Sequence, residues 1–142
     1  METVRRRRRW LGLALLIGAW SANPLGAQVR DRNPAWTAPA KHAALTNPLW
    51  GREDALPGGR RVFEERCSPC HGANAQGSPK APNLVASDVQ AQSDGSLFWK
   101  VSTGDARSGM PAFSFLPPVQ RWQLVLYLRA VGMSPSGSRP AS

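Results

Sequence analysis

The chain has 142 residues, a length that fits one domain, and it carries a formal net charge of +9. Such a charge is typical of proteins that bind nucleic acid, but five of the arginines stand together at positions 5–9, directly before an apolar run. Targeting therefore explains the charge better than nucleic-acid binding does.

Residues 1–27 have the three parts of a secretory signal peptide. The arginines are followed by an apolar run at 10–20 and then by small and polar residues that end at Ala27. We expect cleavage after Ala27, a periplasmic location and no integral membrane span in the mature chain. An uncleaved anchor is the alternative, although the run is shorter than the roughly 20 residues that a spanning helix needs. Because the segment carries five arginines and one glutamate, its removal leaves a net charge of +5.

Residues 28–57 form an N-terminal extension rich in proline, alanine and tryptophan. Its X-Pro pairs exclude a long helix, although residues 40–45 can form a short one. The extension is either anchored to the domain by Trp36 and Trp50 or held loosely. We expect His42, which lies in it, to be solvated and not to be an iron ligand.

The pattern C-x-x-C-H, formed by Cys67, Cys70 and His71, is typical of a covalent haem attachment site. Two thiols at this spacing can form thioethers with the two vinyl groups on one edge of a porphyrin. The imidazole that follows then lies under the ring, where it can bind the iron. The pattern therefore predicts one haem c with His71 as an axial ligand. A helix over residues 59–66 is expected to lead into it.

Three other interpretations of the two cysteines were weighed. A thioredoxin-like dithiol requires a βαβ pattern, and no strands are predicted around Cys67 and Cys70. A structural zinc site needs about four ligands, and the only histidine besides His71 is His42. A simple disulfide would close a very short loop and stabilise the fold little.

After the motif, residues 72–82 are predicted to form a loop because they contain repeated glycine and proline. A backbone carbonyl between Pro79 and Pro82 is expected to accept a hydrogen bond from Nδ1 of His71. A helix is predicted over residues 94–101, with Ser93 or Asp94 as its N-cap and Gly104 as its end.

Met110 follows in a loop, directly before a proline, and its thioether is a suitable second axial ligand for haem iron. Met133 is the other methionine outside the signal peptide, but it is expected beyond the last helix. That helix is predicted over residues 118–131, starting at a proline and ending at Gly132. Residues 133–142 are predicted to be a disordered tail.

Over residues 58–132 the chain resembles class I mono-haem cytochromes c of the bacterial periplasmic type. In that family the first and last helices cross near a right angle, where a Gly/Phe pair meets a Leu/Tyr pair. The residues that carry the resemblance are Gly59, Phe63, Cys67, Cys70, His71, Met110, Leu124 and Tyr127. The resemblance implies an all-α cytochrome c fold of about three to four short helices wrapped around one covalently bound haem.

The resemblance also implies an electron carrier and not an enzyme, with His71 and Met110 as the two axial ligands of the iron. Its partners would be redox proteins with an acidic docking surface, such as a dehydrogenase or a terminal oxidase, and a ring of Lys80, Lys100 and Arg107 could steer them. Two alternatives remain: a haem-bearing subunit of a dehydrogenase or oxidase complex, with residues 28–57 as a docking arm, and a haem peroxidase or gas sensor.

Overall fold

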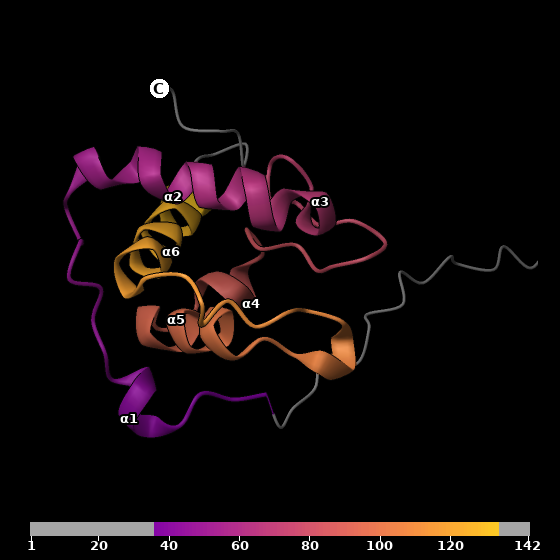
Figure 1. The fold of residues 1–142 in the computed structure, drawn as a ribbon, viewed down its shortest axis with the longest axis horizontal. Coiled ribbons are helices and arrows are strands. Elements are labelled where there is room, and N and C mark those ends of the chain that lie inside the picture. The colour runs from indigo at the N-terminus through magenta and orange to yellow at the C-terminus, as the bar shows by residue number, and fades with distance from the viewer. Residues whose placement is uncertain (1–35, 134–142) are drawn as a thin grey trace, which may run out of the picture. The chain divides into compact units, whose positions relative to one another are not determined.

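The computed structural model describes residues 36–133, and these residues form helices and loops without a β-strand. The predicted signal peptide and the predicted tail beyond Met133 lie outside the described residues. The elements, in chain order, are α1 (Ala40–Ala43), η1 (Glu53–Ala55), α2 (Leu56–Val62), the π-helical turn η2 (Phe63–Cys67), α3 (Ser68–His71), α4 (Ser87–Gln90), α5 (Asp94–Thr103), η3 (Ala106–Ser108) and α6 (Pro118–Met133). The predicted all-α class is confirmed (Figure 1).

The four helices expected from the sequence are present as α1, α2 with η2, α5 and α6, although α2 begins at Leu56 and not at the predicted Gly59. The short turns η1, α3, α4 and η3 were not expected. Ser93 caps α5 as predicted, since its Oγ accepts a bond from the backbone N–H of Ser96 at 3.1 Å. The predicted end of the last helix at Gly132 is wrong, because α6 continues through Gly132 to Met133. The side chain of Gln90 packs over this glycine, where an added Cβ would lie 2.4 Å from Gln90 Cδ. Gly132 therefore serves packing and does not end the helix.

Helices α2 and α6 cross in contact, and this contact uses the Gly/Phe spacing seen in the sequence (Figure 1). At Gly59 a Cβ would lie only 2.0 Å from the backbone oxygen of Gln123, so only glycine allows this approach. One turn later Phe63 is fully buried, and its ring centroid lies 5.4 Å from that of Tyr127. The predicted meeting of Gly59 and Phe63 with the Leu124 and Tyr127 side of the last helix is confirmed.

One hydrophobic cluster joins this crossing to the two loops that carry the predicted site. It contains residues from α2 and α6, one residue of the loop after α3, one residue of α5 and one residue of the loop after Met110. Its buried members are Val62, Phe63, Ala75, Val101, Phe113, Leu124, Tyr127, Leu128 and Val131.

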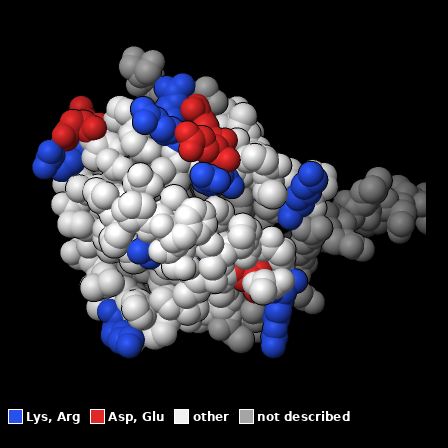
Figure 2. Space-filling view, viewed as in Figure 1, with Lys and Arg blue, Asp and Glu red and all other residues white. Residues whose placement is uncertain are grey.

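On the face drawn in Figure 2, cations lie next to carboxylates at the upper edge, and single cations are scattered over the rest of the face. Nucleic-acid binding proteins instead gather lysine and arginine into a patch or stripe. The face drawn in Figure 2 has no such continuous patch.

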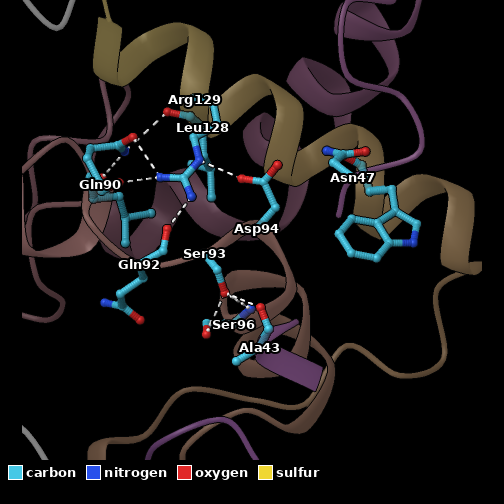
Figure 3. A network of polar contacts seen from close by, with 11 residues as sticks. Ala43, Asn47, Gln90, Gln92, Ser93, Asp94, Ser96, Leu128 and Arg129 are labelled. Carbon is cyan, nitrogen blue, oxygen red and sulfur yellow. Dashed lines mark hydrogen bonds and ion pairs between the residues drawn. The ribbon is translucent and has the colours of Figure 1, made fainter. Parts of the chain in front are cut away.

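A polar network around Arg129 ties the C-terminal half of α6 to α4 and α5 (Figure 3). Its Nε lies 2.7 Å from Oδ1 of Asp94, its Nη1 donates to the backbone oxygen of Gln90 at 2.6 Å, and its Nη2 donates to the backbone oxygen of Gln92. Gln90 in turn donates from Nε2 to the backbone oxygen of Leu84 at 2.7 Å. The network therefore reaches the loop that follows the C-x-x-C-H motif.

The described part of the N-terminal extension packs on α5 and α6. Asn47 is buried, and its Nδ2 donates to the backbone oxygen of Trp122 at 3.0 Å. At Gly95 of α5 a Cβ would lie 2.0 Å from the backbone oxygen of His42, so α1 and α5 touch through their backbones. Trp36 lies under the ammonium group of Lys100, whereas Trp50 is 62% exposed and is not an anchor.

None of the helices in the described residues is long and apolar enough to cross a membrane.

We predict that Gly59→Ala lowers the free energy of unfolding by about 2–3 kcal/mol, because the new methyl group meets backbone that cannot move aside. The matched control is Gly58→Ala, where the methyl group would meet only the end of the Gln123 side chain. That side chain can rotate away at a small cost. Because alanine favours a helix over glycine by about 1 kcal/mol, this gain should offset the cost, and the free energy of unfolding of the control should change little. Chemical denaturation of both variants tests this, and equal losses would contradict the proposed backbone contact.

Candidate functional site

The C-x-x-C-H motif lies at the end of one continuous helical segment, made of α2, η2 and α3. The π-helical turn η2 runs from Phe63 to Cys67, so the residue that anchors the core is joined to the first cysteine by a wide turn. Turns of this kind are frequent at functional sites. The α2/α6 crossing therefore determines where the two cysteines lie.

Both thiols are free in the structure. Cys67 is half-buried against the core cluster, and Cys70 is exposed. Burial, with a smaller contribution from Cys70, raises the pKa of the Cys67 thiol to about 12. Cys67 is therefore a neutral thiol at physiological pH, held at the surface of the core with Cys70 beside it at the solvent boundary.

His71 is buried, with 8% of its surface exposed. Its Nδ1 lies 2.8 Å from the backbone oxygen of Pro82, which confirms the predicted contact with a carbonyl between Pro79 and Pro82. Burial lowers the pKa of His71, and the bond to Pro82 opposes this shift without cancelling it. The imidazole is thus neutral at pH 7, and because a carbonyl can only accept, Nδ1 carries the proton and Nε2 keeps its lone pair.

Backbone contacts within the loop bring Pro82 to His71. The N–H of Gly77 donates to the oxygen of His71 at 2.8 Å, and the N–H of Leu84 donates to the oxygen of Ala75 at 2.7 Å. Gly77 has a φ of +84°, and a Cβ there would lie 2.7 Å from the backbone nitrogen of Asn83. The sequence indicated a turn here, but only the folded loop shows which carbonyl reaches the histidine.

Met110 is half-buried and packs against the core cluster, as Cys67, Leu84, Val85 and Leu116 also do. The other candidate, Met133, is the last residue of α6 and is 74% exposed. Met110, and not the exposed Met133, thus packs against the same core cluster as Cys67. His42 lies in α1 on the side of α5, and its backbone oxygen contacts Gly95.

The described residues contain no cluster of three or more His, Cys, Asp or Glu side chains that could hold a metal ion. A structural zinc site among them therefore has no support. What the fold offers is one buried, neutral imidazole, one half-buried thioether and two thiols, and of these the thioether of Met110 and the thiol of Cys67 pack against the apolar core. These are the donor types that haem c requires.

Comparison with known proteins identifies the family. The family model described as cytochrome C oxidase, cbb3-type, subunit III matches residues 54–128, which is more than half of the chain. The chain belongs to this family of c-type cytochromes. In c-type cytochromes the haem is bound covalently, so haem c, with its iron, is the cofactor of this chain.

Individual relatives agree with this assignment. Cytochrome c550 of Pseudomonas aeruginosa is 30% identical over 112 residues, which cover 76% of this chain and 70% of that protein. The cbb3-type cytochrome c oxidase subunit FixP of Rhizobium etli is 32% identical over 95 residues, 60% of this chain. The matched part is only 33% of the length of FixP, so the chain corresponds to about a third of that relative.

Among solved structures, cytochrome cL from the marine methylotroph Methylophaga aminisulfidivorans superposes with a TM-score of 0.53 at 26% identity. The superposition covers 61% of this chain and 59% of that chain. The class I mono-haem type inferred from the sequence is therefore confirmed.

We predict that Gly77→Ala raises the reduction potential of the haem-loaded protein by on the order of tens of millivolts. The new Cβ would displace Asn83 and, with it, the carbonyl of Pro82, so His71 would become a weaker donor to the ferric iron. Gly51→Ala is the control, because Gly51 also has a positive φ but has no atom within 4 Å of the added Cβ. Spectroelectrochemical titration measures both potentials. Equal potentials in the two variants would show that the loop does not tune His71.

Proposed function

We propose that the chain is a one-electron carrier in which Cys67 and Cys70 bind the haem through thioethers and His71 and Met110 are the two axial ligands of the iron. The observation that carries this proposal is the state of His71: it is buried and neutral, its Nδ1 is occupied by Pro82, and only Nε2 is left to bind a metal. The half-buried Met110, which packs on the same core as Cys67, supports the second ligand.

The haem supplies the one-electron change at its iron. The protein residues determine how readily that change occurs. The bond from His71 to Pro82 orients the imidazole and increases its donor strength, which favours the ferric state. The thioether of Met110 favours the ferrous state relative to a second nitrogen ligand, and the apolar side chains of Leu84, Val85 and Leu116 would limit the access of water. The balance of these contributions sets the reduction potential.

Electron exchange with a partner would take place near Cys70. This residue is exposed although Cys67, three positions earlier, is half-buried, so the haem edge between the two thioethers would lie close to solvent. Transfer through such an edge requires only a brief encounter and no movement of the chain. With His71 and Met110 as ligands, no coordination position on the iron would be left for a substrate, which is why we assign a carrier and not an enzyme.

Partner choice would depend in part on exposed cations. Lys80 and Arg107 are exposed, as the proposed steering of an acidic partner requires. Lys100 differs, because its Nζ lies 4.6 Å from the ring centroid of Trp36 and packs on the N-terminal extension. Lys80 and Arg107 are therefore the more exposed of the three proposed steering cations, and the effect of such steering would weaken with rising salt.

The cellular setting follows from the same proposal. Export by residues 1–27 would deliver the chain to the periplasm, where a dehydrogenase or a terminal oxidase would exchange electrons with it. The FixP relative is named as a subunit of a cbb3-type cytochrome c oxidase. A haem-bearing subunit of such a complex is therefore the second candidate, in which the chain works beside a fixed partner.

Replacing Met110 by alanine should abolish the long-wavelength absorption band of sulfur–iron ligation in the ferric protein and lower the reduction potential. Met133→Ala is the matched control: Met133 is 74% exposed at the end of α6, and its removal should leave both properties unchanged. Survival of the band in Met110→Ala, or its loss in Met133→Ala, would show that the ligand is assigned incorrectly.

Carbon monoxide separates the carrier from a gas-binding or peroxidase function. With both axial positions occupied, the ferrous protein should show no spectral change under carbon monoxide at neutral pH, whereas Met110→Ala should bind it readily. Difference spectra of the two proteins under identical conditions make the comparison. Stoichiometric binding by the unsubstituted protein would favour an open iron and an enzymatic or sensory role.

A further inference from the structure

The loop that carries Met110 is closed on itself by a reciprocal pair of backbone hydrogen bonds. The N–H of Asp105 donates to the oxygen of Met110 at 2.9 Å, and the N–H of Met110 donates to the oxygen of Asp105 at 3.0 Å. Both backbone polar groups of Met110 are thus bonded to one residue. The position of the Met110 side chain consequently depends on where Asp105 lies.

The base of this loop has little freedom to move. Gly104, which ends α5, has a φ of +64°, and a Cβ there would lie 2.6 Å from the backbone oxygen of Met110. On the other side, the N–H of Phe113 donates to the oxygen of Val101 at 3.0 Å, and both residues belong to the buried core. Any movement that withdraws Met110 must therefore begin in residues 106–109, at the tip of the loop.

A side-chain bond spans that tip. Asp105 is buried, with 6% of its surface exposed, and its Oδ2 accepts a hydrogen bond from Oγ of Ser108 at 2.6 Å. The N–H of Ser108 also donates to the backbone oxygen of Asp105 at 3.1 Å. Ser108 is thus bound to Asp105 twice, and the short helix η3 (Ala106–Ser108) is held between them.

We propose that Asp105 and Ser108 are positioning residues that retain Met110 on the iron by holding its loop closed. A neutral thioether is a weak ligand, so the fraction of molecules in which Met110 binds the iron depends on the free energy needed to open the loop. Each bond that must break on opening adds to the free energy of that step, and the 2.6 Å Ser108–Asp105 bond is one of these bonds. The inference rests on the proposed ligation by Met110 and assigns the residues that maintain it.

The test is competition by added imidazole for the iron of the haem-loaded ferric protein. Ser108→Ala removes only an exposed hydroxyl group, and we expect imidazole to bind about five times more tightly to this variant, as the loss of one hydrogen bond implies. Ser114→Ala is the control, because Ser114 is an exposed serine that lies after Met110, and this variant should bind imidazole as the unsubstituted protein does. Ser108→Thr keeps the hydroxyl group and should restore the original affinity.

The titrations are done where circular dichroism shows every variant fully folded, so a general loss of stability cannot produce the difference. Equal imidazole affinities for Ser108→Ala and Ser114→Ala, with the sulfur–iron band present in the unsubstituted protein, would overturn the role of Ser108 and Asp105 and leave the proposed function intact. Absence of that band from the unsubstituted protein would overturn both the ligation by Met110 and the inference built on it.

Discussion

The backbone contact between α2 and α6 at Gly59 is the constraint on which the rest of the structure depends. It brings the two helices close enough for Phe63 to be buried against Tyr127, with ring centroids 5.4 Å apart. Phe63 begins the turn that ends at Cys67, so the same contact sets the position of the haem motif. The core that starts at this crossing continues to Ala75 in one loop and to Phe113 in the other. A single packed cluster thereby supports both sides of the site.

The two proposed axial ligands are held by backbone groups of neighbouring loops. His71 is oriented by the carbonyl of Pro82, and Met110 is oriented by the backbone of Asp105. Backbone groups are well suited to this task because their directions are set by the fold and they have no rotamers to lose. Side chains add to these backbone contacts. Gln90 accepts a hydrogen bond from Arg129 and donates one to the backbone oxygen of Leu84, two residues after Pro82. The polar network of α6 is therefore continuous with the loop that orients the histidine.

Residues 36–53 of the N-terminal extension add a layer that lies before the matched family region, residues 54–128. It is joined to the helices through the backbone contact of His42 with Gly95 and through the buried amide of Asn47. The ring of Trp36 also forms a cation–π contact with Lys100. The extension thus packs against α5 and also contacts Lys100, one of the cations proposed to steer a redox partner.

The sequence by itself determined the haem motif, the helices that flank it and the Gly59/Phe63 spacing, because each depends on residues a few positions apart whose chemistry is local. It also favoured Met110 over Met133 as the proposed second ligand and restricted the predicted hydrogen-bond partner of His71 to four residues. Only the tertiary structure decided that Pro82 provides the carbonyl, that Met110 is half-buried and Met133 exposed, and that Trp50 is not an anchor. It also extended α6 past Gly132, where Gln90 packs from 42 positions earlier in the chain. Such outcomes depend on contacts between distant segments, which local pattern and propensity do not contain.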